Sequence, residues 1–233
     1  METKKGNGAR DFNEPLSATE TFFDKYKKQI LIVVAAVVVI VAALFIYKGC
    51  FAGPREEKAS TALATGQEYF NSEMFDKALN GDGAGYAGFV KIASDYSGTD
   101  AANLANLYAG LCYANLGKWN EAVTYLDKFS PKGDAMVSPS AVAALGNAYA
   151  ETGNIDKAVS TLKKAADMAD SKAADDMNSS IAPTFLVQAG ELLESQGKKD
   201  EALKIYQDVK KKYVNSQIVQ SSDIDKYIER VSE

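Results

Sequence analysis

The 233-residue chain contains no histidine, and this absence removes the commonest general base, the commonest metal ligand and the usual pH-sensitive side chain together. We therefore expect no enzymatic activity, no catalytic residue, no metal and no cofactor. Only two cysteines are present. Cys50 follows a long apolar run, whereas Cys112 lies on an apolar helix face, where a small buried core residue is expected. The two cysteines therefore predict no disulfide framework.

Basic residues are scarce in the larger part of the chain. Residues 1–53 hold 7 basic and 5 acidic side chains, and residues 54–233 hold 19 and 26, a net charge of −7. Nucleic-acid binding requires a basic face that displaces counterions from phosphate. We therefore expect no nucleic-acid partner, and an acidic body is equally unsuited to spreading on anionic lipid.

One long hydrophobic run lies near the N-terminus. Residues 30–47 contain no charge, Gly or Pro, and Lys27, Lys28 and Lys48 flank them. At about 1.5 Å per residue the run covers about 27 Å, close to the roughly 30 Å hydrocarbon core of a bilayer. A buried core helix, the alternative, would show a polar face, and this run has none. The sequence therefore predicts a transmembrane helix over residues 30–48, in contact with the lipid bilayer.

Lysine and arginine are more numerous before this run than after it. Six precede it: Lys4, Lys5, Arg10, Lys25, Lys27 and Lys28. Three follow closely: Lys48, Arg55 and Lys58. Because cytoplasmic flanks carry the excess, we predict a single-pass inner (plasma) membrane protein with a cytoplasmic tail over residues 1–29. A linker over residues 49–58 would then lead to a periplasmic or other extracytoplasmic body.

A cleaved signal peptide is the alternative to a retained anchor. The apolar core is longer than the usual stretch of about 7–15 residues, and no small-x-small cleavage site follows closely, so the anchor is favoured. The sequence leaves open whether Cys50 is modified.

Three segments of the body share one internal spacing. Each has a Gly, an apolar or aromatic residue three positions later, a second Gly after seven and an Ala after twelve. The sets are Gly110, Tyr113, Gly117 and Ala122; Gly146, Tyr149, Gly153 and Ala158; and Gly190, Leu193, Gly197 and Ala202. The first Gly and the Ala are predicted to lie where two antiparallel helices cross. The second Gly is expected to end the first helix in a left-handed turn.

This repeated helical hairpin resembles the tetratricopeptide repeat. The resemblance implies an all-α protein whose single transmembrane helix is followed by an α-solenoid of repeats over residues 59–213. The clear repeats are expected near residues 103–134, 139–172 and 183–213, and a capping helix over residues 214–233. That cap would bury one stripe formed by Ile224, Tyr227, Ile228 and Val231.

A degenerate copy over residues 59–98 precedes the clear repeats. Gly66 stands at the first-Gly position, but Glu73 replaces the second Gly. Residues 80–85 interrupt its second helix, which is expected to resume over residues 86–95.

Two motifs and one acidic cluster are set aside as ligand sites. The G-x-G-x-x-G string of residues 83–88 lacks the preceding strand of a dinucleotide site. A calcium loop counted from Asp76 has alanine where oxygen ligands are needed. The aspartates at 167, 170, 175 and 176 are interpreted as part of a solvated loop rather than a cation site.

In tetratricopeptide proteins the first helix of each pair lines a concave surface that holds peptide. The resemblance implies these groove positions here: Gln67, Phe70, Asn71, Leu107, Leu111, Asn115, Asn147, Glu151, Val187, Glu191 and Glu194. They are apolar at one end and acidic at the other. Family members that bind the C-terminal carboxylate of a chaperone use Lys and Arg at these positions. In this chain none of these positions is Lys or Arg. The alternative, that these residues only solubilise a scaffold with contacts elsewhere, stays open.

The segment from Glu20 to Lys28, Glu-Thr-Phe-Phe-Asp-Lys-Tyr-Lys-Lys, stands directly before the single span. With exported helical repeats behind it, this arrangement resembles the YfgM-like family of ancillary translocon subunits. The resemblance implies a membrane-anchored protein-interaction scaffold beside the secretory channel, in contact with translocon subunits, periplasmic chaperones or emerging clients. The alternative is a structural or oligomerisation module of another cell-envelope complex. In either case the expected partners are proteins rather than small-molecule substrates.

Overall fold

A computed structural model describes residues 18–232, with side chains from residue 25 onward. All regular structure in this range is helical, and it contains no strand. The chain divides into two compact units after Gly53. The first seventeen residues of the predicted cytoplasmic tail lie outside the described range.

The first unit consists of α1 (Ala18–Tyr47) and a short π-helical segment, η1 (Lys48–Ala52). Among the described residues, one helix near the N-terminus is long and apolar enough to cross a membrane by length and composition. None of its apolar window is buried against protein. A helix of similar length and composition in the core of a soluble protein would be mostly buried.

Residues 49–58, predicted as a linker, are helical in the structure. The residues after η1 belong to α2 (Gly53–Asn71). Pro54 lies in the first turn of α2, directly after the π-helical turn, and helix-forming Glu, Lys and Ala residues follow.

The start of α2 is tied to the body by side chains. Both carboxylate oxygens of Glu56 accept backbone N–H bonds at 2.8 Å, from Asp100 and from Ala101. The Arg55 guanidinium donates to the Asp95 carbonyl, also at 2.8 Å. These residues therefore belong to the folded body rather than to a free connection.

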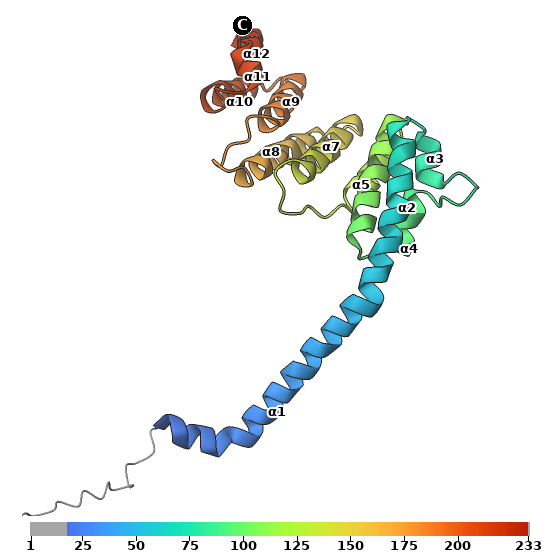
Figure 1. The fold of residues 1–233 in the computed structure, drawn as a ribbon. Helices are drawn as coiled ribbons and strands as arrows, with labels where there is room; N and C mark the ends of the chain where they lie inside the picture. The colour runs from blue at the N-terminus through green and yellow to red at the C-terminus, as the bar shows by residue number, and fades with distance from the viewer. Residues whose placement is uncertain (1–17, 233) are drawn as a thin grey trace, which may run out of the picture. The chain divides into compact units, whose positions relative to one another are not determined.

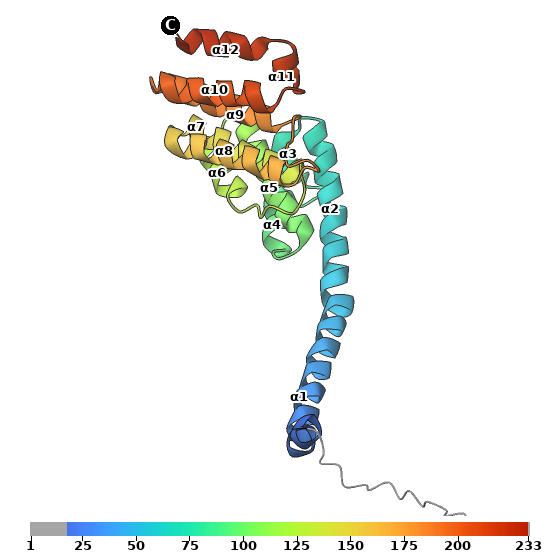
Figure 2. The same cartoon turned by 90° about the vertical axis from the view of Figure 1, so that its left-hand side faces the viewer.

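The second unit is a stack of antiparallel helical hairpins (Figures 1 and 2). Its three regular hairpins are α5 (Asp100–Asn115) with α6 (Trp119–Leu126), α7 (Val137–Glu151) with α8 (Ile155–Ser171), and α9 (Ala182–Ser195) with α10 (Lys199–Lys212). The first helix of each ends at a left-handed glycine, with φ of 70° at Gly117, 79° at Gly153 and 73° at Gly197. The predicted role of the second Gly is confirmed.

The first Gly of each hairpin marks a close helix crossing. A Cβ added to Gly146 would lie 2.9 Å from Leu162 Cγ, and Gly110 faces Leu126 in the same way at 2.5 Å. The sequence motif predicts Ala158 at the crossing with Gly146. The structure places Leu162 there, one turn further along α8, while Ala158 is fully buried nearby.

The hairpin formed by α2 with two short helices departs from this pattern. The second helix of this hairpin is split into α3 (Phe75–Asn80) and α4 (Phe89–Asp95). The helix expected to resume at residue 86 begins at Phe89. Gly88 has a φ of 90°, which is not helical, and the backbone N–H of Tyr86 donates to Asp82 within the loop. The buried Tyr86 hydroxyl donates to the Ala78 carbonyl at 2.8 Å.

The loop between α3 and α4 is organised by one carboxylate. Asp82 Oδ1 accepts backbone N–H bonds from Ala84 at 2.8 Å and Tyr86 at 3.0 Å. Asp82 Oδ2 accepts the Tyr69 hydroxyl at 2.8 Å. The glycine-rich string therefore lies in a hydrogen-bonded loop between two helices, without the strand that a dinucleotide site requires.

The C-terminal segment contains two helices, α11 (Gln217–Gln220) and α12 (Asp223–Ser232). In α12, Ile224 and Val231 are buried, and Tyr227 and Ile228 pack half-buried against the same apolar cluster. That cluster also contains buried side chains of α8, α9 and α10, so α12 covers the end of the last hairpin (Figure 2).

Candidate interaction groove

An open apolar pocket of about 360 Å³ lies between the first helices of two neighbouring hairpins. Its walls come from α5, from the start of α7 and from the residue just before α7. The lining residues are Leu107, Leu111, Met136, Val137, Ser140 and Ala141. Apart from the Ser140 hydroxyl, the lining side chains are apolar, so the pocket is suited to an apolar group.

Two of the lining side chains are large, apolar and half exposed. Met136 is 49% exposed and Val137 is 50% exposed. In the described part of the second unit only Met74 and Val214 share this property, and these two stand singly. Scattered exposed apolar side chains are ordinary on a protein surface, but neighbouring ones around a pocket indicate a contact site.

The segment that carries Met136 and Val137 is held by Asp134. The Asp134 carboxylate accepts the backbone N–H groups of Met136 at 3.0 Å, Val137 at 2.6 Å and Ser138 at 3.1 Å. It also accepts the Ser138 hydroxyl at 2.6 Å. Partial burial opposes its ionisation, but these hydrogen bonds outweigh that effect and lower the pKa of Asp134 to about 2. Asp134 therefore caps α7 and fixes one rim of the pocket.

A second loop supports the same rim. The Asn178 side-chain amide donates to the Ala135 carbonyl at 2.9 Å and lies 3.7 Å from Met136 Sδ. The Asn178 backbone N–H in turn donates to buried Asp170 at 2.7 Å. Hydrogen bonds thus hold Ala135, Met136 and Ser138 in place around Val137. This rim of the pocket is therefore preformed.

Asp170, interpreted from the sequence as part of a solvated loop, is instead buried near the end of α8 and has a structural role. It accepts the Lys212 ammonium at 2.5 Å and the Tyr213 hydroxyl at 2.6 Å. Burial and this hydrogen bond raise the pKa of Tyr213. Among the described residues no group of three or more His, Cys, Asp or Glu side chains is arranged to hold a metal ion.

The structure brings together some of the predicted groove residues. Leu107 and Leu111 line the pocket, Leu107 being buried and Leu111 half-buried. Phe70 is half-buried, with its ring 5.6 Å from that of Phe75 and 5.2 Å from that of Tyr108, and it does not line the pocket. The Gln67 amide donates to the Tyr108 hydroxyl at 3.0 Å. The remaining positions are exposed at Asn71, Asn115, Asn147, Glu151 and Glu191, buried at Val187 and half-buried at Glu194.

Glu194, at the acidic end, is engaged within the chain. Arg230 of α12 binds it through two hydrogen bonds of 2.8 Å, and Tyr206 donates its hydroxyl to the same carboxylate. Partial burial opposes ionisation, but the bonds from Arg230 and Tyr206 hold the pKa of Glu194 below its usual range. None of the groove positions carried over from the family is basic, but Arg230 of the capping helix α12 places a basic side chain beside Glu194.

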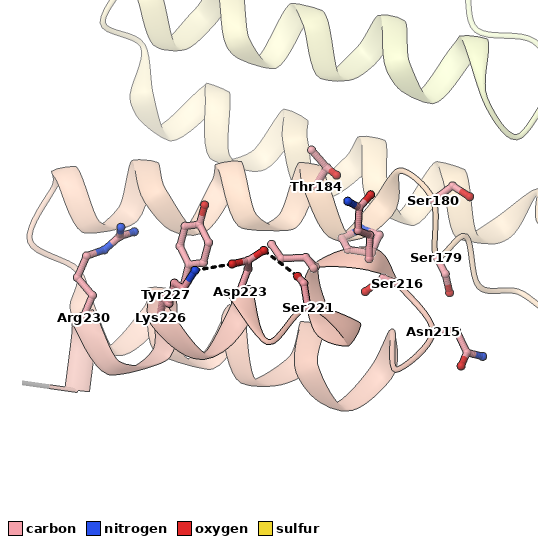
Figure 3. A pocket seen from close by; sticks show the side chains of 13 residues that line it. Ser179, Ser180, Thr184, Asn215, Ser216, Ser221, Asp223, Lys226, Tyr227 and Arg230 are labelled. Atoms are coloured by element: carbon pink, nitrogen blue, oxygen red, sulfur yellow. Dashed lines mark hydrogen bonds and ion pairs between the residues drawn. The ribbon is translucent and has the colours of Figure 1, made fainter.

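A larger pocket of about 820 Å³ lies between the start of α9 and the C-terminal helices (Figure 3). Its lining is polar, with hydroxyl groups from Ser179, Ser180 and Thr184. The charged groups there are already paired, since Lys226 binds Asp223 at 2.6 Å and Arg230 binds Glu194. This polar pocket offers neither an exposed apolar anchor nor an unpaired charge.

Sequence reasoning did not identify Met136, Val137, Ser140 and Ala141. The first two lie at or before the start of α7, outside the repeat motif from which the groove positions were carried over. A signal was present, because Met136 and Val137 are adjacent large apolar residues directly beside the predicted start of a repeat helix.

The stacked hairpins with small residues at their crossings define a tetratricopeptide-type α-solenoid. The model of the tetratricopeptide repeat-like domain matches residues 20–224, and the chain belongs to that family. Repeats of this kind generally serve as non-catalytic scaffolds for protein–protein contacts. No curated protein matches the chain significantly.

Solved structures agree on the fold. The nearly identical TPR-like repeats of a protein assigned as a kinesin light chain from Podosopora anserina match with a TM-score of 0.53 and 13% identity. The match covers 76% of this chain and 94% of that one. A single-substitution variant of the same repeats matches with the same values. At this identity the likeness concerns the fold alone.

Proposed function

We propose that this chain is a membrane-anchored scaffold for protein–protein contacts, and that the pocket between α5 and α7 receives an apolar side chain of the partner. The observation that carries the proposal is the grouping of half-exposed Met136 and Val137 with Leu111 around a pocket whose rim is fixed by Asp134 and Asn178. An apolar side chain inserted into a formed pocket is the usual anchor of a protein interface.

The proposed anchor is residues 30–48, which cross the inner membrane once with the N-terminus in the cytoplasm. The unburied apolar window of the N-terminal helix and the excess of Lys and Arg before it support this topology. The repeat body, proposed as residues 59–213 with a cap over 214–233, would then be periplasmic. A reporter that is active only after export, fused behind Glu233, is expected to be active. A reporter active only in its cytoplasmic form would contradict the topology.

The finer proposal is a role as an ancillary subunit of the secretory translocon or a factor linked to periplasmic chaperones. It is supported by the resemblance of the Glu20–Lys28 segment to that of the YfgM-like family, combined with helical repeats behind one apolar helix. The alternative, a structural or oligomerisation module of another envelope complex, makes a different prediction in the same experiment.

The test is photo-crosslinking in native membranes from Val137 of the full-length chain. Val214 is the matched control because it is the same residue type with 49% exposure. We expect products with a translocon or chaperone subunit from position 137 and not from position 214. Products consisting only of a second copy of this chain would favour the oligomerisation module, and identical products from both positions would refute the groove.

A pair of double variants tests the same pocket quantitatively. The variant Met136→Gln with Val137→Thr removes the apolar rim, whereas Met74→Gln with Val214→Thr makes the same changes at the other exposed apolar positions. Loss of an interface anchor typically costs more than about 1 kcal/mol, roughly fivefold in Kd. We expect the first variant to lower recovery of the crosslinked partner by at least about that factor and the second to leave it unchanged.

A further inference from the structure

One face of α7 runs from the apolar pocket to an unpaired carboxylate. Ser140 and Glu151 are eleven residues apart, which places them within about 20° of each other around the helix and about 16 Å apart along it. Asn147 lies on the same face, since seven residues also return to nearly the same direction. All three are exposed. The pocket and Glu151 therefore belong to one continuous stripe.

Glu151 differs from the other two acidic groove residues. Glu194 is bound by Arg230, and Glu191 interacts with Tyr227, whose pKa is raised first by burial and then by Glu191. Within the described residues Glu151 has neither a hydrogen bond nor an ion pair from its carboxylate. Among the groove carboxylates, Glu151 is thus the one without a partner in the described part of the chain.

The space between pocket and carboxylate is polar. Ser140 and Asn147 offer a hydroxyl and an amide, and neither side chain is hydrogen-bonded in the described part of the chain. An extended peptide carries unpaired backbone N–H and C=O groups that such side chains can bind, whereas the backbone groups of a helix are already paired. The pocket is also small, with room for one or two side chains rather than for the apolar stripe of a helix.

We propose, on the basis of the function proposed above, that the groove binds an extended protein segment with one large apolar residue and a Lys or Arg about five residues away. An extended chain advances about 3.3 Å per residue, so five residues span the 16 Å from the pocket to Glu151. The apolar side chain enters the pocket of Leu111, Met136 and Val137, and the cation pairs with Glu151. The acidic charge of the body favours the approach of such a segment.

The test uses fluorescein-labelled peptides of Ser and Asn with one Phe, and the full-length chain in lipid nanodiscs. One Lys is placed three, five or nine residues from the Phe, in both directions, and each peptide has a counterpart with Gln in place of Lys. Fluorescence anisotropy gives the Kd. An exposed ion pair is worth about 0.2–1 kcal/mol, so Lys at spacing five is expected to lower Kd by about 1.5- to 5-fold relative to Gln. Spacings three and nine should give a smaller gain.

Three controls identify the cause of any gain. Glu151→Gln should abolish the difference between Lys and Gln peptides, whereas Glu121→Gln, an exposed carboxylate on α6, should preserve it. About 0.5 M salt should reduce the gain, because exposed charges are then screened. The variant Met136→Gln with Val137→Thr should weaken every Phe peptide.

The failures of the two proposals are distinguishable. Equal Kd for Lys and Gln peptides at every spacing, with binding still lost in the pocket variant, would overturn the basic-residue inference and leave the apolar anchor standing. Absence of binding by every Phe peptide, or binding indifferent to the pocket variant, would overturn both.

Discussion

The first hairpin, formed by α2 with α3 and α4, has the same kind of helix crossing as the three regular hairpins. The number of residues between the two sides of the crossing differs. In the regular hairpins the residue opposite the first Gly lies sixteen positions later, as in Gly110 with Leu126 and Gly190 with Tyr206. In the first hairpin Gly66 faces Phe89, twenty-three positions later. The seven additional residues are accommodated in the loop organised by Asp82. The comparison teaches that the packing at the crossing, rather than the spacing in the sequence, defines the repeat.

The largest expected effect breaks the crossing of the first hairpin. In Gly66→Ala the new Cβ would collide with the Tyr86 hydroxyl and lie 2.7 Å from Phe89 Cζ. Both aromatic rings are buried and Phe89 is fully so, which leaves them little room to move. Overpacking of this kind costs about 1–3 kcal/mol, here at the upper end, and the helix propensity of Ala offsets about 1 kcal/mol of it, so we expect a net loss of about 2 kcal/mol. Urea-induced unfolding followed by circular dichroism measures it.

Gly146→Ala is the matched substitution in a regular hairpin. Its Cβ would lie 2.9 Å from Leu162 Cγ and 3.2 Å from Cδ2, atoms of a side chain that can adjust. Replacing a helical Gly by Ala also gains about 1 kcal/mol of helix propensity, which offsets much of the crowding. We therefore expect a change near zero. A greater loss at Gly146 than at Gly66 would contradict the comparison.

An intermediate loss of stability is expected from a substitution in the loop before α7. Asp134 organises this loop as Asp82 organises the loop of the first hairpin. Asp134→Asn removes the charge that binds three backbone N–H groups and the Ser138 hydroxyl. Asn keeps one acceptor oxygen but loses the charge and the second oxygen, and a hydrogen bond to a charged group is worth about 1 kcal/mol more than a neutral one, so we expect a loss of about 1–2 kcal/mol. Asp208→Asn, at an exposed position on α10, is the control and should be nearly neutral. Equal losses in the two variants would refute the capping role.

The same carboxylate predicts a pH dependence of a definite sign. The pKa of Asp134 is about 2 in the folded chain and about 3.9 when unfolded, so the unfolded state binds a proton first as the pH falls. Its contribution is complete above about pH 4 and is lost between about pH 4 and 2. Hydrogen bonds from Ala84, Tyr69 and Tyr86 lower the pKa of Asp82 too, so both loops weaken in acid. In Asp134→Asn the acid-induced loss of stability should be smaller.

A smaller effect of opposite sign is expected from repairing an irregularity of the first hairpin. Glu73 occupies the turn position with a φ of 58°, where the regular hairpins have Gly. A non-glycine residue in this left-handed region is strained, so Glu73→Gly should stabilise the chain by about 0.5–1 kcal/mol. Gly153→Glu makes the reverse change in a regular hairpin and should destabilise it by a similar amount. A decrease in the unfolding midpoint of Glu73→Gly would contradict the prediction.

Most of the fold was predictable because it depends on residues with few substitutes. The left-handed glycines at 117, 153 and 197 and the small residues at the crossings fix the hairpins wherever they occur in the sequence. The partner of each crossing was harder to predict. Ala158 and Leu162 lie on the same face of α8, one turn apart, and only the packed structure distinguishes them.

The candidate groove was predictable in part. Leu107 and Leu111 follow from the repeat register, but Met136 and Val137 depend on how the connection before α7 folds back through Asp134 and Asn178. The pairing of Glu194 with Arg230 joins residues thirty-six positions apart through a helix outside the repeats. Long-range contacts of this kind leave no periodic trace in a sequence.

The attachment of α2 to the body has a mechanical consequence. A pulling force applied along the chain at Gly53 would first meet Arg55 and Glu56, which hold the end of α4 and the first turn of α5. Part of the load would therefore pass directly to α5, whose other side chains form a wall of the apolar pocket. Tension at the N-terminal side of the repeats and the shape of the groove are thus connected through a single helix.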